Sequence, residues 1–399
     1  MRKAVVASIA VLVLATVLPG AGKIRPTGTY SIAAFDPATG DLGVAVQSHY
    51  FAVGTVVPFA KAGVGAIATQ CYQNSSYGAR GLELLEKGLS PEQVVAELTK
   101  ADKDRDWRQL GVVDAHGRSF AYTGKNCPEW KGDRYGPNYV VQGDIVAGEA
   151  VVANMEKAFL NSDASPLAER LLAALDTAEA AGGDKRGKQA AALLVVRKPA
   201  YDEATDRYVD LRVDDSPEPL KELRRLYNVW ARYNLLWPRL EKAADLAKAG
   251  KTEEARIERE HALGPLEQDI RANPNDANAL YILANALADP DLGAQDLPRA
   301  LELAERAVKL QPNDVDGVSG VVRILVQSKH NPDRAIELAE RTLSLYPDFD
   351  NIRHLEAEAY FQKGNVTKAI EIETEVVRRN PDNTDYAESL KRFKAAQKP

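Results

Sequence analysis

The chain has 399 residues, of which 45% are hydrophobic and 27% charged, and it carries a formal net charge of -6. Its length exceeds the roughly 100–200 residues typical of one domain, so we expect two domains. The negative balance and the lack of a basic stripe argue against a nucleic-acid partner. The five histidines are scattered without the paired spacing of metal ligands, so we expect no metal and no cofactor.

The first 22 residues have the pattern of a secretory signal peptide. Arg2 and Lys3 form a charged start, residues 4–18 an apolar run, and residues 19–22 a small-residue exit. The run is shorter than the about 20 apolar residues that a membrane-spanning helix needs. We therefore expect cleavage near Lys23 and an exported protein, periplasmic or extracellular, with no membrane span after cleavage. An uncleaved signal anchor is the alternative.

From residue 29 to about residue 213, strand patterns alternate with pairs of helix patterns. The predicted strands are 30–35, 42–47, 54–58, 63–70, 109–114, 119–123, 188–197 and 207–213. The predicted helices are 79–87, one that begins after the N-cap Ser90, 149–160 and 166–181. Helix pairs set between hairpins suit two sheets packed together and covered by helices. We therefore predict an α+β four-layer αββα sandwich, with a domain at residues 23–213.

After the stretch 214–219 the chain has helical patterns alone. Related sequences recur at 299–307, 334–342 and, more loosely, 368–372. The alanines Ala300, Ala335 and Ala369 recur at roughly the 34-residue period of tetratricopeptide (TPR) repeats. The sequence therefore predicts an all-α TPR superhelix at 266–399, after a helical linker or degenerate repeat at 214–265. The concave face of such a superhelix usually binds a protein or peptide ligand. A structural role as spacer or dimer contact is the alternative.

A threonine at the start of the first predicted strand is the main candidate for chemistry. If the bond between Gly28 and Thr29 is cut, Thr29 carries both a hydroxyl nucleophile and an α-amine. The pKa of an α-amine, about 7.7–8.0, lies near enough to neutrality for the amine to act as base for the hydroxyl. The alternative is that Thr29 is simply a strand residue, because threonine is common in strands.

Short motifs within residues 29–213 carry a family resemblance. They include Gly-Val-Ala-Val-Gln-Ser-His at 43–49, Ala-Thr-Gln at 68–70, Val-Gln-Gly-Asp at 141–144 and Gly-Gly-Asp-Lys-Arg-Gly-Lys-Gln at 182–189. In these motifs the chain closely resembles the bacterial family DUF1028, which is placed in the N-terminal nucleophile (Ntn) hydrolase superfamily. The resemblance implies an αββα fold and cleavage of amide bonds by an N-terminal Thr, Ser or Cys. Gly-Thr is a junction that such enzymes cut in themselves, so Thr29 is assigned as the catalytic nucleophile. The chain departs from proteasome-like relatives at Gln47, where they carry an acid.

Several polar residues are expected around Thr29. Antiparallel pairing brings the end of the second strand beside Thr29, so Ser48 can bond its amine and His49 can bind substrate. Gln70 ends another buried strand and can donate to an oxyanion, and Asn74 can line the cleft. The alternatives are a capped strand end for the first pair and a helix N-cap for Asn74.

Two charged segments add further candidates. Lys61 lies in a predicted turn and can orient the amine, or it is simply solvated there. In the glycine-rich loop 182–187, Asp184 can order the amine and Arg186 can hold a substrate carboxylate. A plain helix-to-strand turn explains the glycines of this loop equally well. Asp144 is assigned to substrate binding at a position where relatives more often carry Asn.

The chain has two cysteines, Cys71 and Cys127. An oxidising compartment permits a disulfide between them, although the sequence does not show that they are close in space. Cys127 is also a weaker candidate nucleophile, because no activating base is evident beside it.

The sequence thus favours an exported Ntn-type amidohydrolase acting on a small amide or peptide-like substrate, joined to a TPR protein-binding scaffold. The competing hypothesis is a non-catalytic binding or scaffold protein of the cell envelope. A mature chain that kept residues 23–28 would favour the second hypothesis.

Overall fold

The computed structural model of the chain describes residues 28–162, 165–200, 205–292 and 295–397. The chain divides into two compact units, Met1–Tyr227 and Asn228–Pro399. The predicted signal peptide at 1–22, and residues 23–27 after it, lie outside the described residues. In the described ranges, no helix combines the length and apolar character that a membrane crossing requires.

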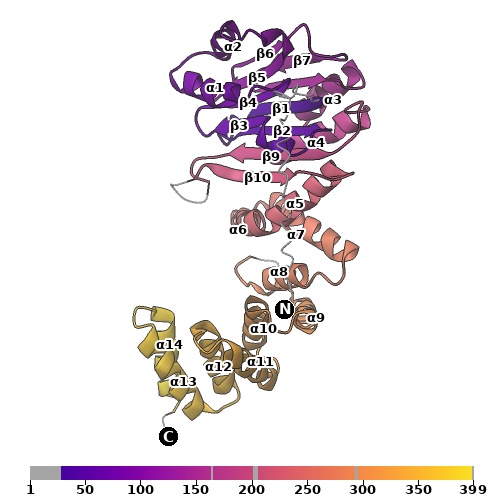
Figure 1. The fold of residues 1–399 in the computed structure, drawn as a ribbon. Helices are drawn as coiled ribbons and strands as arrows, with labels where there is room; N and C mark the ends of the chain where they lie inside the picture. The colour runs from indigo at the N-terminus through magenta and orange to yellow at the C-terminus, as the bar shows by residue number, and fades with distance from the viewer. Residues whose placement is uncertain (1–27, 163–164, 201–204, 293–294, 398–399) are drawn as a thin grey trace, which may run out of the picture. The chain divides into compact units, whose positions relative to one another are not determined.

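Two antiparallel sheets build the first unit (Figure 1). The larger sheet has the order β10 (Arg207–Val213), β9 (Ala190–Val196), β2 (Leu42–Ser48), β1 (Thr29–Phe35), β8 (Tyr139–Asp144) and β7 (Gly132–Gly136). The smaller sheet has the order β3 (Pro58–Lys61), β4 (Gly65–Cys71), β5 (Arg108–Asp114) and β6 (Ser119–Thr123). β1 therefore lies in the interior of the larger sheet, between β2 and β8.

Each sheet has one face against the other sheet and one face against a pair of helices. The helices α1 (Ser76–Glu86) and α2 (Pro91–Lys100) contact the smaller sheet, and α3 (Glu149–Leu160) and α4 (Leu167–Ala180) contact the larger one. Ser90 caps α2 in a capping box with Gln93, as expected of an N-cap residue. Between the sheets lies an apolar core of small and branched side chains, which include Ala33, Val44, Val46, Ala66, Ala68 and Val140. Strands buried on both faces explain the continuous apolar runs of the sequence.

Two details of the strand prediction were wrong. The predicted strand at 54–58 is the 3-10 helix η1 (Val53–Thr55), and β3 begins only at Pro58. A Cβ on Gly54 would lie 2.7 Å from the Cβ of Ala192, so this glycine serves a close approach of the backbone to β9. The strands β7 and β8 were not predicted as a pair, because the sequence of β7, Gly-Asp-Arg-Tyr-Gly, has no apolar alternation.

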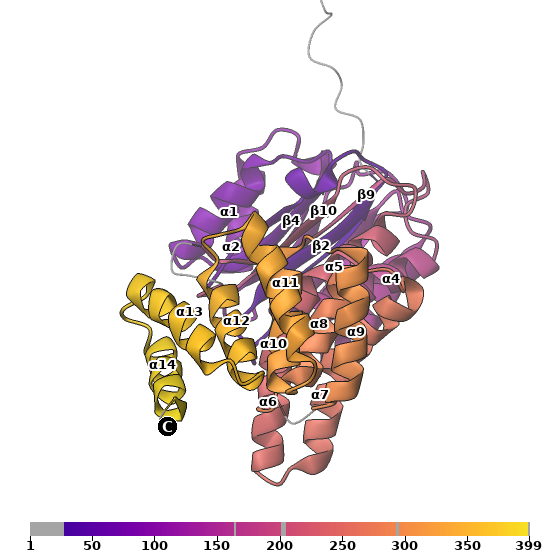
Figure 2. The same cartoon turned by 90° about the horizontal axis from the view of Figure 1, so that it is seen from below.

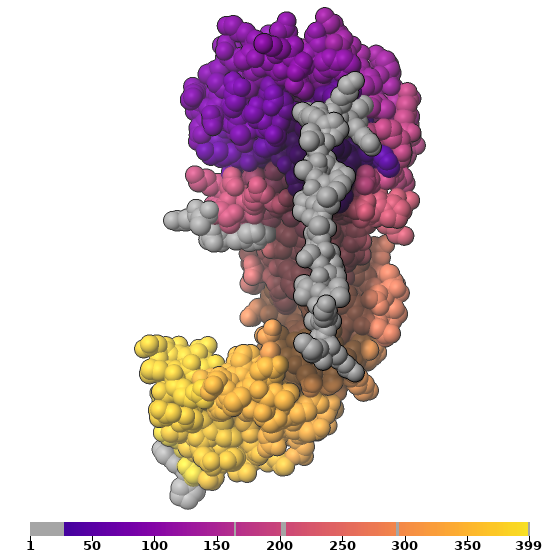
Figure 3. Space-filling view, in the orientation of Figure 1, coloured from indigo at the N-terminus to yellow at the C-terminus, as the bar shows by residue number. Residues whose placement is uncertain are grey.

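The second unit contains only helices among its described residues. After α5 (Pro219–Asn234) these are α6 (Leu236–Lys248), α7 (Thr252–Ala272), α8 (Ala277–Ala288), α9 (Leu297–Leu310), α10 (Val315–Gln327), α11 (Pro332–Leu345), α12 (Asp350–Gln362), α13 (Val366–Arg379) and α14 (Thr384–Ala396). Seen from below, α8 to α14 follow one another as packed neighbours (Figure 2). Their side chains form one continuous body, coloured orange to yellow (Figure 3).

Recurrent residues explain the repeat pattern. Ala300, Ala335 and Ala369 are all completely buried, where a larger side chain would separate the packed helices. The residues Asp276, Asp296, Asn331, Asn365 and Asn383 each cap the helix that follows by accepting a backbone N–H. Helix packing and capping therefore recur together, as TPR repeats require.

Candidate active site

Thr29 is the first residue of β1 and is completely buried. It lies opposite Ser48 of β2 on one side and opposite Asp144 of β8 on the other. The described chain begins one residue earlier, at Gly28. Ser48 at the end of β2 and Asp144 at the end of β8 therefore both lie beside the Gly28–Thr29 peptide bond.

The carbonyl oxygen of Gly28 accepts two hydrogen bonds from side chains. Ser48 Oγ donates to it at 2.5 Å and Arg186 Nη2 donates to it at 2.6 Å. Thr29 Oγ1 in turn donates to Ser48 Oγ at 3.1 Å. Two preorganised donors on one carbonyl oxygen are the arrangement that stabilises an oxyanion during attack on that carbonyl.

Asp184 fixes the position of the Arg186 guanidinium. Its carboxylate, with a fully buried side chain, accepts from Arg186 Nε at 3.1 Å, Arg186 Nη2 at 2.7 Å and the Arg186 backbone N–H at 2.8 Å. It also accepts the backbone N–H of His49 at 2.9 Å. Asp184 is therefore a positioning residue that acts through Arg186. The loop reaches this arrangement with Gly182 and Gly183 at positive φ, 108° and 48°.

A buried amide–carboxyl network lies on the other side of Thr29. Gln70 Nε2 donates to the Thr29 carbonyl oxygen at 3.0 Å, to Asp144 Oδ1 at 3.2 Å and to Gln109 Oε1 at 2.7 Å. Burial, above all, raises the pKa of Asp144 well above its usual value, and nearby Asp184 adds to this effect against the opposing charge of Arg186. Asp144 Oδ2 has no hydrogen-bond partner among the described residues.

The polar network extends between the two sheets through residues that sequence reasoning missed. Ser31 Oγ donates to Gln70 Oε1 at 2.5 Å, and Gln142 Nε2 donates to Ser31 Oγ at 3.2 Å. Gln142, a glutamine directly after the apolar start of its strand, was the available signal, because a buried amide needs hydrogen-bond partners. Gln47 lies outside this network: it pairs with Tyr30, and both of its amide atoms lack a partner within the described parts of the chain.

Two predicted site residues have no contact with Thr29 among the hydrogen bonds and ion pairs found for them in the described residues. Lys61 Nζ pairs with Glu86 at 2.6 Å, with both side chains about half exposed (48% and 52%). Lys61 is paired with Gly65, five residues before Gln70 along β4, which is roughly 16 Å at about 3.3 Å per residue. Asn74 accepts from Ser76 at the start of α1. Asn74 thus lies at the start of a helix, as the alternative interpretation has it, and its place in the cleft stays a prediction.

The imidazole of His49 is at the edge of the site. His49 is exposed, and its Nδ1 lies 3.4 Å from the carbonyl oxygen of Lys188. Its backbone N–H bonds to Asp184, so His49 is tied to the loop 182–187 through its main chain.

Cys71 and Cys127 form a disulfide with their Cα atoms 6.0 Å apart. Cys71 directly follows Gln70, so the disulfide ties the loop around Cys127 to the end of β4 beside the site. A disulfide sulfur is not a thiolate, so Cys127 is no nucleophile in this form.

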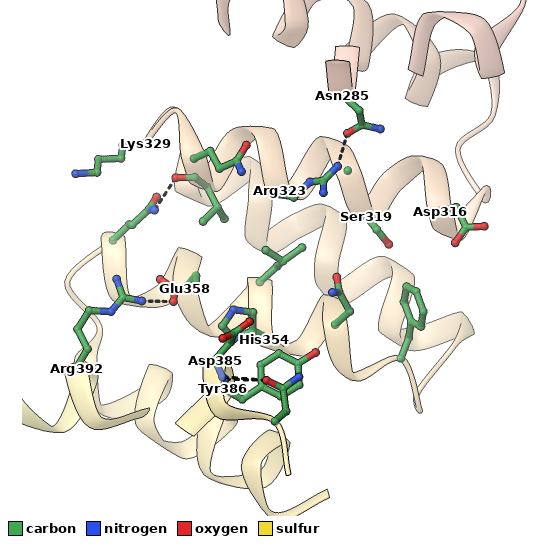
Figure 4. Close-up of a pocket in the computed structure, with 18 of the residues that line it drawn as sticks. Asn285, Asp316, Ser319, Arg323, Lys329, His354, Glu358, Asp385, Tyr386 and Arg392 are labelled. Carbon is green, nitrogen blue, oxygen red and sulfur yellow. Dashed lines mark hydrogen bonds and ion pairs between the residues drawn. The ribbon is translucent and has the colours of Figure 1, made fainter. Parts of the chain in front are cut away.

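The second unit has a groove with a volume of about 780 Å³. Its lining includes Asn285, Arg323, Lys329, His354, Glu358 and Arg392 (Figure 4). Arg323 Nη2 donates to Asn285 Oδ1 at 2.7 Å, and Arg392 is paired with Glu358. Apart from the Arg392–Glu358 pair, the groove offers amide groups, the cations Arg323 and Lys329, and the carboxylates Asp316 and Asp385 for contact with polar ligands.

The two units correspond to two known families. A model of the family of unknown function DUF1028 matches residues 29–223, and a tetratricopeptide-repeat model matches residues 327–392. A crystal structure of a DUF1028 protein from Silicibacter pomeroyi is 32% identical, with 52% of this chain and 91% of that chain covered and a TM-score of 0.48. The chain belongs to the DUF1028 family, and its second unit contains TPR repeats at residues 327–392, which indicate a protein-interaction scaffold.

Other solved structures are similar to the repeats. MamA from Desulfovibrio magneticus RS-1 is 25% identical over 39% of this chain and 85% of that chain, with a TM-score of 0.32. PilF of Pseudomonas aeruginosa is 16% identical over 41% of this chain and 69% of that chain, with a TM-score of 0.30. None of the curated proteins matches the chain.

Proposed function

We propose that the chain is an exported amidohydrolase of the Ntn type, which makes its own nucleophile by cutting the bond between Gly28 and Thr29. One observation carries the proposal. The carbonyl oxygen of Gly28 lies between the donors of Ser48 and Arg186, and the Thr29 hydroxyl bonds to the same Ser48. The layers of two facing sheets between helix pairs, and membership in DUF1028, support the same assignment.

Self-cleavage begins with attack of Thr29 Oγ1 on the carbonyl carbon of Gly28. Ser48 and Arg186 stabilise the negative charge that develops on the carbonyl oxygen. The C–N bond then breaks, the hydroxyl proton is transferred to the Thr29 nitrogen, and an ester joins Gly28 to Thr29 Oγ1. Water hydrolyses this ester, which releases the preceding segment with a carboxylate and leaves Thr29 with a free α-amine.

Turnover of a substrate repeats the same chemistry with the new amine as base. The amine takes the proton of Thr29 Oγ1, and the oxygen attacks the substrate's amide carbonyl. Ser48 and Arg186, no longer occupied by Gly28, donate to the substrate oxygen. The amine leaving group departs with a proton, and water hydrolyses the acyl ester. The substrate is a small amide or peptide-like compound.

Paired substitutions at the nucleophile test this proposal. Thr29→Ala removes the hydroxyl and is expected to leave the chain uncut, whereas Thr29→Ser keeps a hydroxyl and is expected to be cut. Intact mass and N-terminal sequencing of the exported proteins read out the cut. Cleavage of the alanine variant at the same bond would assign the cut to another protease and contradict the proposal.

The groove of the repeats supports a second function, binding of a protein or peptide ligand in the cell envelope. Arg323, whose side chain donates to the neutral amide of Asn285, supplies a positive charge to the groove. Titration of the intact chain with a library of acidic peptides tests this function. Binding that Arg323→Glu abolishes, in a chain that stays uncut, would favour the scaffold over the hydrolase.

A further inference from the structure

We infer that the acyl pocket of this site admits only glycine, and that Ile145 is the residue that enforces this limit. The inference rests on the proposed function and names its substrate class. The substrates are amides in which the carbon next to the reacting carbonyl carries no side chain, as in glycyl peptides and glycyl amides.

The space around Gly28 carries this inference. A Cβ placed on Gly28 would lie 2.8 Å from the Cβ of Ile145 and 2.9 Å from both Nε and Nη2 of Arg186. Nonbonded carbon atoms pack at about 3.5–4.0 Å, so even a methyl group does not fit there without displacement of a neighbour.

Neither neighbour can move away easily. The Arg186 side chain is held by two bonds to Asp184, and its Nη2 also bonds the Gly28 carbonyl oxygen. The contact atom of Ile145 is its Cβ, which no side-chain rotation displaces. The Ile145 carbonyl accepts from the Lys185 backbone at 3.0 Å, and the next residue, Val146, pairs with Asp184. The backbone of Ile145 and Val146 is therefore bonded to the loop 182–187, which also holds Arg186 in place.

The backbone of Ile145 provides a second, independent observation. Its φ is +55°, in the left-handed region that a β-branched residue rarely adopts. Strained backbone of this kind persists only where the surrounding structure determines it, and it occurs preferentially at ligand and active sites. Ile145, which has this conformation, directly follows the buried Asp144. Its Cβ faces the position that a side chain on the acyl residue would occupy.

The same limit applies to substrates because self-cleavage and turnover form the same linkage. In both, an acyl group is esterified to Thr29 Oγ1 while its carbonyl oxygen meets Ser48 and Arg186. The carbon next to that carbonyl therefore occupies the place of the Gly28 Cα. A substrate with an alanyl acyl residue would bring its methyl group against Ile145.

A matched pair of substrates tests the inference on the mature protein. Succinyl-glycyl and succinyl-alanyl 4-nitroanilides differ by one methyl group. We expect kcat/KM for the glycyl compound to exceed that for the alanyl compound by about 100-fold or more. Ile145→Gly removes the wall and is expected to reduce this ratio at least tenfold, whereas Ile145→Val keeps the Cβ and is expected to preserve the ratio.

Self-cleavage and folding give two further readouts. Gly28→Ala is expected to slow self-cleavage, and Ile145→Gly in the same chain to restore it. In the uncut Thr29→Ala background, Gly28→Ala is expected to lower the melting temperature and Ile145→Gly to reverse that loss. This last pair measures the fit without any catalysis.

The outcomes separate the two claims. A protein that hydrolyses both anilides equally well, or a Gly28→Ala chain that is cut and folds like the wild type, would refute the glycine limit alone. A protein that hydrolyses neither anilide and keeps its Gly28–Thr29 bond would refute the proposed function and the substrate class with it.

Discussion

Arg186 donates from Nη2 to the carbonyl oxygen of Gly28 at 2.6 Å, across 158 positions of sequence. The contact joins the loop between α4 and β9 to the start of β1. Because Asp184 holds the guanidinium from the same loop, the cation is aimed before any reaction begins. Such preorganisation is the property by which enzymes stabilise developing charge.

Loss of the Arg186 donor is therefore expected to slow self-cleavage. Removal of one oxyanion donor typically reduces a rate by about 10²- to 10³-fold. We expect Arg186→Ala to show this loss, and Arg186→Lys to recover only part of it because lysine lacks the fork that bonds both Asp184 and the carbonyl. Pulse labelling followed by intact-mass analysis measures the rate. The matched control is Lys185→Ala, an exposed cation of the same loop, whose rate should equal that of the wild type.

Lys61 is expected to have no part in the cut. Its ammonium pairs with Glu86 on the exterior of α1, and such exposed pairs contribute only about 0–1 kcal/mol to stability. Lys61→Ala should therefore be cut at the wild-type rate, with a melting temperature close to that of the wild type. An uncut but folded Lys61→Ala protein would contradict this expectation.

The disulfide is expected to contribute substantially to the stability of the first unit. It closes a loop with a sequence separation of 56 residues, for which the chain-entropy relation gives about 4 kcal/mol. Replacement of both Cys71 and Cys127 by serine should lower the free energy of unfolding by this order, measured by urea titration. Reducing agent should destabilise the wild type and leave the double variant unaffected; equal effects on the two proteins would contradict the assignment.

The stability of the repeats is expected to fall as the pH rises. Burial, together with the nearby Glu340, raises the pKa of Glu356 from 4.5 to about 7. The folded repeats then favour the protonated carboxyl, so this contribution is fully present below pH 4.5 and is lost as the pH rises to about 7. The loss is on the order of 3 kcal/mol.

Glu356→Gln isolates this effect because glutamine keeps the shape of the protonated carboxyl. Calorimetry at pH 5 and pH 8 should show a repeat unit that is less pH-dependent and more stable at pH 8 than the wild type. Glu388→Gln, at an exposed position of α14, is the control and should follow the wild type. Parallel behaviour of Glu356→Gln and the wild type would contradict the predicted shift in pKa.

Much of the architecture could be predicted because buried helices and strands carry apolar residues at regular spacing in the sequence. The helix predicted at 149–160 coincides with α3, and the recurrent alanines of the repeats are all fully buried. β7 could not be predicted, because it forms through its pairing with β8 and has no apolar alternation of its own.

The candidate site could be predicted from the sequence for those residues that lie at the ends of strands paired with β1. Antiparallel register brings Ser48 and Asp144 opposite Thr29, and Gln70 reaches it from the facing sheet. Lys61 was misplaced because the register of β3 on β4 was unknown, and that register puts it at the opposite end of β4. The role of Ile145 had no sequence signal, since a positive φ is not expected of a β-branched residue.

Self-cleavage between Gly28 and Thr29 is tested best by the N-terminus of the mature protein. Wild-type protein should be purified after export, without added protease, and its intact mass and N-terminal sequence determined. We expect a single species that begins at Thr29. A homogeneous species that begins near Lys23 and keeps Gly28 joined to Thr29 would contradict it, because the α-amine would then lie six residues from the proposed nucleophile.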